Sequence, residues 1–516
     1  MSNTQKSLQQ HFQQFRQHII GENLTHKINQ KKLAIIYADW TASGRLYQPI
    51  EEYITQQLGP YVANTHTETN LTGSAMTHAY HDAQKVIKHH VNACDNDILI
   101  TAGAGMTAVV NKFQRILGLR IPERMQDQVQ FNDEDKPVVF VTHMEHHSNQ
   151  TTWYECDVTL EIVDPDENGL PSLTHLQELL AQYQSRKLKI GSFTACSNVT
   201  GIKTPYYQLA EVMHQHGGVC FVDFACSAPY VDIDMHPANP QQTLDAIFFS
   251  PHKFLGGPGS SGVLIFNKTL YKNKVPDHPG GGTVTWTNPW GEHSFFNNIE
   301  VREDGGTPGF LQCIRTALAI KVKDAMGVDN IMKREQQITH YVMSELSTNK
   351  SVVMLEPTIT ERLAIVSFYI PNVHYNLVVR LLNDKFGIQT RGGCSCAGTY
   401  GHILLNVDHD TSNKITEKIN RGDYAEKPGW IRASFHPTTT DEEVKFVVDA
   451  INQLTENIEQ WQKDYRFNPA SGDFEHIKLE VEFPNINDFS PLTSNSANFL
   501  TGTNKNDKSL MQRIFS

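Results

Sequence analysis

The chain has 516 residues, of which 39% are hydrophobic and 19% charged, so it can bury a sizeable core and form two to four domains. No run approaches the ~18 apolar residues of a membrane span, and the N-terminus lacks the apolar core of a secretory signal. We therefore expect a cytoplasmic protein with no membrane partner. The net charge of −12, without a cluster of Lys and Arg, argues against a nucleic-acid partner.

Between residues 75 and 270, short apolar runs alternate with helical periodicity, which is typical of a mainly parallel sheet covered by helices. The sequence predicts, in chain order, helix 75–91, strand 98–101, helix 105–117, strands 138–142 and 190–194, helix 205–216, and strands 219–223, 246–249 and 262–266. A helical run follows over 310–346. This order predicts an α/β fold.

A second region has different spacing, typical of a smaller α+β domain. Its predicted elements are strands 352–355 and 364–370, helix 375–386, strands 388–391 and 430–435, and a helix from about 440, preceded by a capping-box pattern at Thr439 and Glu442. Residues after 465 are polar and predict an irregular appendage or a partly disordered tail. The predicted organisation is an N-terminal helical segment 1–30, a large domain 31–325, a small C-terminal domain 326–464 and an extension 465–516.

A lysine follows one of the predicted strands, in the segment Ser250-Pro-His-Lys253, and a glycine-rich stretch begins at Gly256. An amine that forms imines must be held rigidly and kept partly unprotonated. A desolvated position at a strand end suits that requirement. A surface lysine after a strand has the same pattern, so this segment alone leaves both interpretations open.

A carboxylate, Asp223, ends the apolar strand 219–223. A buried carboxylate needs a partner, and the protonated ring nitrogen of a cofactor is one candidate. At ~4 Å and an effective dielectric constant of ~20, such a pair attracts by about 4 kcal/mol. A loop cap or a metal ligand would also explain the residue.

Two further segments carry polar or small residues after predicted strands. The turn containing Ala104 and Gly105 leads into a helix, and exposed N–H groups there suit a phosphate, although such turns are common. In the second segment, His146 and His147 are adjacent. Neighbouring side chains on an extended chain point to opposite sides, which disfavours a shared metal ion. We expect His146 to stack on a flat cofactor and His147 to be a solvated loop residue.

These segments, in this order, resemble the class V aminotransferases, and most closely their cysteine desulfurase and selenocysteine lyase group. The resemblance extends from about residue 37 to 448. It implies a fold type I enzyme that depends on pyridoxal 5'-phosphate (PLP). By resemblance, Lys253 carries PLP as a Schiff base, Asp223 pairs with the pyridine nitrogen and His146 stacks on the ring.

The same resemblance implies further cofactor contacts. Asn198 is similar to the residue near the phenolic oxygen of PLP, and Ser250 and His252 are similar to phosphate ligands. Thr307 is similar to the threonine that reaches the phosphate of the neighbouring subunit. The resemblance therefore implies a homodimer.

Two arginines at strand positions of the second region are candidates for binding an amino acid substrate. A guanidinium group grips a carboxylate through two parallel hydrogen bonds, and Arg391 and Arg432 are placed to do so. Arg432 matches the carboxylate-binding arginine of the family. An ordinary surface ion pair would also explain either residue.

The segment Arg391-Gly-Gly-Cys-Ser-Cys396-Ala resembles the family pattern that carries the sulfur-accepting cysteine, which places Cys396 at that position. A thiolate there would attack the sulfur of the substrate and leave alanine and a cysteine persulfide. Cys394 has no role by this match. The pair lacks two further placed ligands, so we expect no metal site.

The chain departs from the family pattern at two places. Cys226 stands where the family usually has glutamine, and the turn 103–106 reads Gly-Ala-Gly-Met, so backbone amides or Thr107 must contact the phosphate. The leading interpretation is a cysteine desulfurase, with a possible sulfur-acceptor protein as partner. The alternatives are another class V reaction, such as transamination, epimerisation or C–S or C–N cleavage, and a catalytically silent scaffold.

Overall fold

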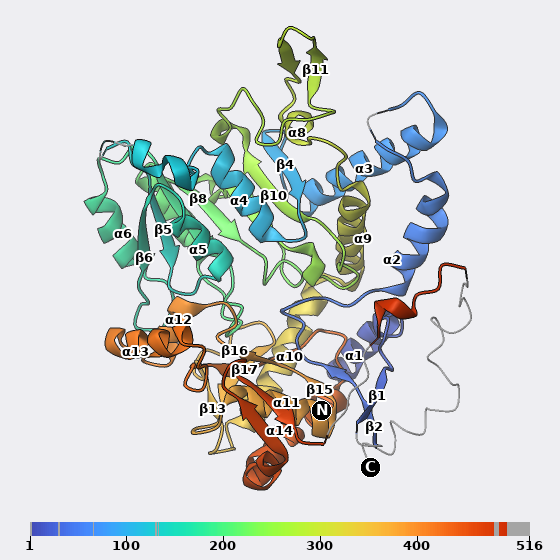
Figure 1. Ribbon diagram of the computed structural model, residues 1–516, viewed down its shortest axis with the longest axis vertical. Helices are drawn as coiled ribbons and strands as arrows, with labels where there is room; N and C mark the ends of the chain where they lie inside the picture. The colour runs from blue at the N-terminus through green and yellow to red at the C-terminus, as the bar shows by residue number, and fades with distance from the viewer. Residues whose placement is uncertain are drawn as a thin grey trace. The chain divides into compact units, whose positions relative to one another are not determined.

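The computed structural model describes residues 3–28, 31–65, 67–129, 132, 134–478 and 484–492 (Figure 1). The chain divides into two compact units. The large unit comprises Thr41–Met332 and the short segment Cys396–Tyr400, and the small unit comprises the described residues of Met1–Trp40, Lys333–Ser395 and Gly401–Ser516. The domain boundaries expected at 31, 326 and 465 remain predictions.

The described part of the large unit is built on a seven-stranded sheet with the order β4-β10-β9-β8-β7-β5-β6. Strand β10 runs antiparallel to both of its neighbours, and the pairs from β9 to β6 are parallel. The expected mainly parallel α/β sheet is confirmed. Its strands are β4 Asp97–Ala102, β5 Val138–Thr142, β6 Thr159–Val163, β7 Lys189–Thr194, β8 Val219–Asp223, β9 Ala246–Phe249 and β10 Gly262–Asn267.

Helices and one hairpin complete the large unit. The helices are α2 Gln48–Glu52, α3 Leu71–His90, α4 Met106–Ile116, α5 His147–Tyr154, α6 Leu173–Gln182, α7 Tyr206–Gln215, α8 Ile299–Glu303 and α9 Phe310–Met326, and the hairpin pairs β11 Val284–Thr287 with β12 His293–Phe295. Helix α10, Val328–Leu346, begins after Gly327. The expected helical run 310–346 is therefore two helices, because Gly327 has a φ of 78° and ends α9.

The central strands are buried on both faces. Every residue of β5, β7 and β9 is buried, as expected for the central strands of a covered parallel sheet. Most residues of the edge strand β6 are only half-buried, and its mixed sequence Thr-Leu-Glu-Ile-Val gave no strand signal. With the sheet faces covered, polar chemistry is confined to the loops at the strand ends.

The small unit contains a four-stranded sheet with the order β13-β14-β17-β16. The segment 388–391, expected to be one strand, is divided between two sheets. Strand β15 pairs with β3, and β16 pairs with β17. The remaining elements are α1 Asn3–Arg16, β1 Thr25–Ile28, β2 Lys31–Ala34, β3 Ile36–Tyr37, β13 Val353–Met354, β14 Ile365–Tyr369, α11 Tyr375–Phe386, β15 Ile388–Gln389, β16 Arg391–Gly393, α12 Gly398–Leu404, α13 His409–Asn420, β17 Trp430–Ser434, α14 Asp441–Trp461, β18 Tyr465–Asn468 and β19 Asp473–His476.

Two details of the small unit differ from the sequence predictions. The capping box of α14 is formed by Thr440 and Glu443, one residue later than expected. Thr439 is already engaged, because its hydroxyl accepts a hydrogen bond from the backbone N–H of His436. The segment after 465 begins with the β18–β19 hairpin, in which Phe467 and Phe474 pack together, so its first part is regular.

None of the helices in the described ranges has both the length and the apolar character needed to cross a membrane.

Candidate functional site

Five segments singled out in the sequence leave the large sheet at one edge. Strands β4, β5, β7, β8 and β9 run in the same direction, so the loops that follow them lie at their carboxyl ends. Asp223 ends β8 and is in register with Phe248 of β9. Lys253 follows β9 by four residues and therefore emerges beside Asp223. Burial raises the pKa of Asp223, and the charge of Lys253 partly offsets this rise, which agrees with their proximity.

Asp223 is a buried carboxylate with a single hydrogen-bond donor among the described residues. The residue is 3% exposed, and its Oδ1 accepts a hydrogen bond from the backbone N–H of Ala225 at 2.7 Å. Burial raises the pKa of Asp223 to about 6, against the smaller lowering effects of Ala225 and Lys253. A carboxylate in this position favours a cation beside its second oxygen.

Close backbone packing holds the loop of Lys253. The loop forms a short 3-10 helix, Pro251–Lys253, and the backbone N–H of Gly44 donates to His252 O at 2.9 Å. A Cβ on Gly44 would lie 1.9 Å from Phe254 O, and one on Gly257 would lie 1.8 Å from Pro251 O. Only glycine permits these approaches, so Gly44 and Gly257 allow the close packing that fixes the loop.

A concave set of polar groups lies where α4 begins. A Cβ on Gly105 would lie 3.4 Å from Ser250 Oγ and 3.7 Å from His252 Nε2. Ser250 Oγ accepts from the backbone N–H of Met106 at 2.9 Å, while Ala104 is exposed in the same turn. Backbone N–H groups, a hydroxyl and an imidazole at a helix N-terminus suit a phosphate. Burial, with the charge of Lys253, lowers the pKa of His252 to about 4.

His146 is positioned by a buried carboxyl group that the sequence did not reveal as important. Glu145 has no exposed surface and accepts hydrogen bonds from Thr142 Oγ1 at 2.7 Å and from the backbone N–H of Thr194 at 2.8 Å. Burial raises its pKa to about 8. His146 itself caps α5, with its Nδ1 accepting from the backbone N–H of Ser148. The ring is therefore fixed at the strand edge.

The loop after β7 holds Asn198, which is 6% exposed. Cys226, on the loop after β8, lies beside it, because the Cys226 thiol is 3.8 Å from Ser197 O. Thr107 is exposed, and its hydroxyl forms a 2.7 Å hydrogen bond with Ser148 Oγ. Thr307 is exposed on the loop between α8 and α9.

The segment Cys396–Tyr400 is held against α5 through His147. The backbone N–H of His147 donates to Cys396 O at 2.7 Å, and His147 Nε2 accepts from the backbone N–H of Gly398 at 3.0 Å. Thr399 Oγ1 donates to Gln150 Oε1 at 2.9 Å. His147 is exposed, as expected of a solvated residue, but it begins a helix instead of lying in a loop, and it binds this segment. Cys396 is exposed, and the hydrogen bond to His147 fixes it one residue away from His146.

Both candidate substrate arginines lie in the small unit and share one carboxylate. Arg432 Nη2 lies 2.8 Å from Asp39 Oδ1, and Arg391 Nε lies 3.7 Å from Asp39 Oδ2. The arginines face one another across the β16–β17 pair. Arg432 is 2% exposed, so an ordinary surface ion pair does not describe it. Two guanidinium groups on one carboxylate leave a net positive charge for a further anion.

Lys323 is a buried lysine of the large unit, and the sequence gave no sign of it. Its Nζ donates to Ala228 O at 2.8 Å and to Val231 O, in the loop that follows Asp223. It also lies 5.8 Å from the centre of the Phe254 ring. Burial lowers the pKa of Lys323 to about 7. Lys323 therefore supports both the Asp223 loop and the residue after Lys253.

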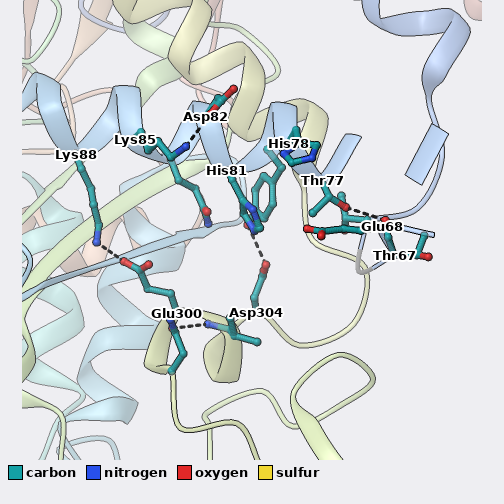
Figure 2. Close-up of a pocket in the computed structure, with 15 residues that line it drawn as sticks. Thr67, Glu68, Thr77, His78, His81, Asp82, Lys85, Lys88, Glu300 and Asp304 are labelled. Atoms are coloured by element: carbon teal, nitrogen blue, oxygen red, sulfur yellow. Dashed lines mark hydrogen bonds and ion pairs between the residues drawn. The ribbon is translucent and has the colours of Figure 1, made fainter. Parts of the chain in front are cut away.

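A cavity of about 650 Å³ lies elsewhere in the large unit, between α3 and the segment around α8 (Figure 2). Its lining contains charged groups such as Lys85, Lys88, Glu300 and Asp304, and Lys88 pairs with Glu300 at 2.6 Å. None of the site residues predicted from the sequence lines it. The cavity therefore lies apart from the residues gathered at the carboxyl ends of the strands.

Replacing Asp223 with asparagine is expected to stabilise the cofactor-free protein at neutral pH. The folded-state pKa, about 6, exceeds the ordinary value of 3.8, so the folded state binds more protons between these values and loses stability as the pH rises. One pKa unit corresponds to about 1.36 kcal/mol, so the ionised carboxylate destabilises the folded state by about 3 kcal/mol above pH ~6. Urea unfolding of the cofactor-free Asp223→Asn variant should show this gain near pH ~7.5 and almost none near pH ~4. A variant less stable than the wild type at both pH values would contradict it.

The seven-stranded sheet and the helices that cover it form an α/β fold of fold type I. The chain belongs to the class V aminotransferase family, which matches residues 36–447. This is a family of PLP-dependent enzymes.

Similar proteins include a probable cysteine desulfurase of Staphylococcus aureus, which is 26% identical over 438 residues, 84% of this chain and 94% of that protein. A probable cysteine desulfurase of Halalkalibacterium halodurans is 27% identical over 367 residues, 70% of this chain and 84% of that protein. Among solved structures, a cysteine desulfurase of Thermococcus onnurineus has 21% identity and a TM-score of 0.68, covering 86% of this chain and 98% of its own. An Escherichia coli cysteine desulfurase has 21% identity and a TM-score of 0.64, covering 81% and 94%. The structures support the fold.

Proposed function

We propose that the chain is a PLP-dependent cysteine desulfurase, which removes sulfur from L-cysteine and leaves it as a persulfide on Cys396. The observation that carries the proposal is the attachment of the Cys396 segment to His147, directly beside His146, on the same strand edge as Lys253 and Asp223. A transaminase needs no thiol at this position.

The residues at the strand edge fit PLP. The second carboxylate oxygen of Asp223 has no hydrogen-bond partner in the described residues, and a protonated pyridine nitrogen supplies the missing cation. The space over Gly105 that a Cβ would fill is bordered by Ser250 and His252 and suits the phosphate. Lys253 provides the amine for covalent attachment. We assign the ring contact to His146 and the phenolic-oxygen contact to Asn198.

Bound PLP supplies an electron sink for the substrate α-carbon. With the cofactor bound, the amine of Lys253 would move a proton at that carbon. Arg432, with Arg391 beside it, binds the substrate α-carboxylate, which gains from the net positive charge that the Asp39 cluster leaves. Asp223 keeps the ring nitrogen protonated, because a nearby anion favours the charged form.

Sulfur transfer to Cys396 balances without an oxidant. The Cys396 thiolate would attack the sulfur of the substrate, and the bond between that sulfur and the β-carbon would break. The electron pair of the bond would pass to the β-carbon, which would take up a proton and become the methyl group of alanine. L-cysteine and one thiol thus become alanine and one persulfide. A partner protein or a small thiol then takes the persulfide sulfur.

Product analysis under anaerobic conditions tests the proposed reaction. Incubation of the holoenzyme with L-cysteine should give alanine in step with persulfide or sulfide. A keto acid or a racemised amino acid as the main product would instead identify another class V reaction with Cys396 as a bystander. The Cys226 thiol, which stands where the family has glutamine, makes this comparison necessary.

We also propose a homodimer in the cytoplasm. The exposed Thr307 is available to reach the phosphate bound by a second copy of the chain. The proposed substrate and the thiol chemistry of Cys396 suit a reducing compartment.

Loss of the His147 side chain is expected to slow sulfur transfer more than cofactor binding. His147→Ala removes the acceptor for the Gly398 N–H, and one such hydrogen bond is worth ~1 kcal/mol, or about a 3- to 10-fold change in the transfer rate. In the matched variant His147→Gln, Oε1 occupies nearly the position of Nε2 and should restore most of the rate. Rapid mixing with L-cysteine, followed by persulfide detection, measures this step. Equal loss in both variants would contradict the role of the acceptor.

A further inference from the structure

A cluster of three potential ligands lies at the opposite edge of the large sheet from Lys253. Asp97 is the first residue of β4, Cys94 precedes it in the turn after α3, and His236 comes from the long loop after β8. One ligand atom from each residue lies within 4.8 Å of the others. His236 Nε2 is 2.6 Å from Asp97 Oδ2, and the backbone N–H of Cys94 donates to the same oxygen at 2.7 Å.

The second oxygen of Asp97 is an independent sign that a ligand is missing. Asp97 has no exposed surface, and its Oδ1 is buried without a hydrogen-bond partner among the described residues. A buried carboxylate oxygen without a donor is unfavourable, because it has lost its water and gained nothing in exchange. A cation bound to Asp97 would satisfy it.

The surrounding charges also favour a cation. Asp234 Oδ1 accepts from the backbone N–H of His236 and from Asn92 Nδ2. The Lys88 Nζ donates to the backbone oxygen of Asp97 at 2.7 Å, but this lysine is paired with Glu300 at 2.6 Å (Figure 2). With Lys88 neutralised in this way, the two aspartates leave an excess of negative charge around His236.

We propose that Cys94, Asp97 and His236 bind a divalent metal ion of the zinc class. One sulfur, one oxygen and one nitrogen ligand suit zinc, which binds thiolates at ~2.3 Å and imidazoles or carboxylates at ~2.0–2.2 Å in tetrahedral geometry. A water molecule takes the fourth position. The ion requires Cys94 as a thiolate and His236 as a neutral imidazole, as metal ligands of these types generally must be. The ion would tie the α3–β4 turn to the loop after β8.

Cobalt(II) is the probe for this site, because a cobalt–thiolate bond absorbs in the near ultraviolet. Titration of the holoenzyme, with the unmetallated holoenzyme as reference, should give a thiolate band that saturates at one ion per chain. Cys94→Ser should remove the band, and His236→Ala should weaken cobalt binding by more than ~10-fold, as expected for loss of a ligand. Zinc should displace the cobalt.

Two control variants separate this site from other metal-binding groups. Cys396→Ala must retain the band, because that exposed thiol belongs to the proposed sulfur-transfer site. His409→Ala removes an imidazole with an 89% exposed side chain and should leave the affinity unchanged. The folded state of each variant is checked by the visible absorbance of the lysine-bound cofactor at the other sheet edge. A cobalt band that survives Cys94→Ser, or no band in the wild type, would overturn the proposal.

Discussion

Replacing Lys253 with alanine is expected to lower the turnover of L-cysteine by at least ~10²- to 10⁴-fold, the range that a positioned proton-transfer group contributes. The loss should be larger still if covalent attachment also speeds cofactor exchange with the substrate. Lys253 lies beside Asp223 at the carboxyl ends of the strands. The short helix Pro251–Lys253 contains no second lysine that could replace it. Alanine formation from L-cysteine measures the effect, and the visible absorbance of lysine-bound cofactor should disappear with it.

Lys268→Ala is the matched control. Lys268 is an exposed lysine just after β10, which runs antiparallel, so it lies at the edge of the sheet away from Lys253. Its removal should leave both the absorbance and the turnover unchanged. Turnover by Lys253→Ala within a few fold of the wild type would refute the assignment of the amine.

Replacing Cys396 with alanine is expected to abolish the enzyme persulfide and to reduce alanine formation from L-cysteine by ~10³-fold or more. A nucleophile held in place by the structure is worth a very high effective concentration, and a free thiol in solution does not match it. Cofactor binding should persist, because Lys253, Asp223 and the Gly105 turn are untouched. Single-turnover mixing with anaerobic L-cysteine, with alanine and protein persulfide as readouts, measures both effects.

Cys394→Ala provides the comparison for Cys396. The Cys394 thiol lies 3.1 Å from Pro428 O within the small unit and has no assigned part in the chemistry. Its removal should preserve persulfide formation. Persulfide found on another cysteine in Cys396→Ala, with alanine formed at the wild-type rate, would assign the acceptor role elsewhere.

The sequence predicted most of the large sheet because its central strands are buried on both faces. Continuous apolar runs ending in a polar residue, as in Val219–Asp223, mark both the strand and the point where it meets the site. Helix α11 was also predicted with its observed bounds, Tyr375–Phe386, from its apolar periodicity. The segments Ser250–Lys253 and Gly103–Met106 lie close together because of the order of the strands in the sheet. That order could not be predicted from local sequence patterns.

Other features depend on contacts between distant parts of the chain and could not be predicted. Glu145 has an ordinary polar sequence context, yet it is completely buried and accepts hydrogen bonds from residues of β5 and β7. The role of His147 depends on a segment about 250 residues later in the chain. The separation of β15 from β16 arises because β3, from near the N-terminus, pairs with the first of them.

Mapping the cofactor attachment site tests the central claim most directly. Reduction of the holoenzyme with borohydride, proteolysis and mass spectrometry should place one pyridoxyl phosphate group on the peptide that contains Lys253. Lys323, a buried lysine near the Asp223 loop, should carry none. A label on Lys323 or on any other lysine, or a cofactor released intact from the reduced protein, would contradict the account.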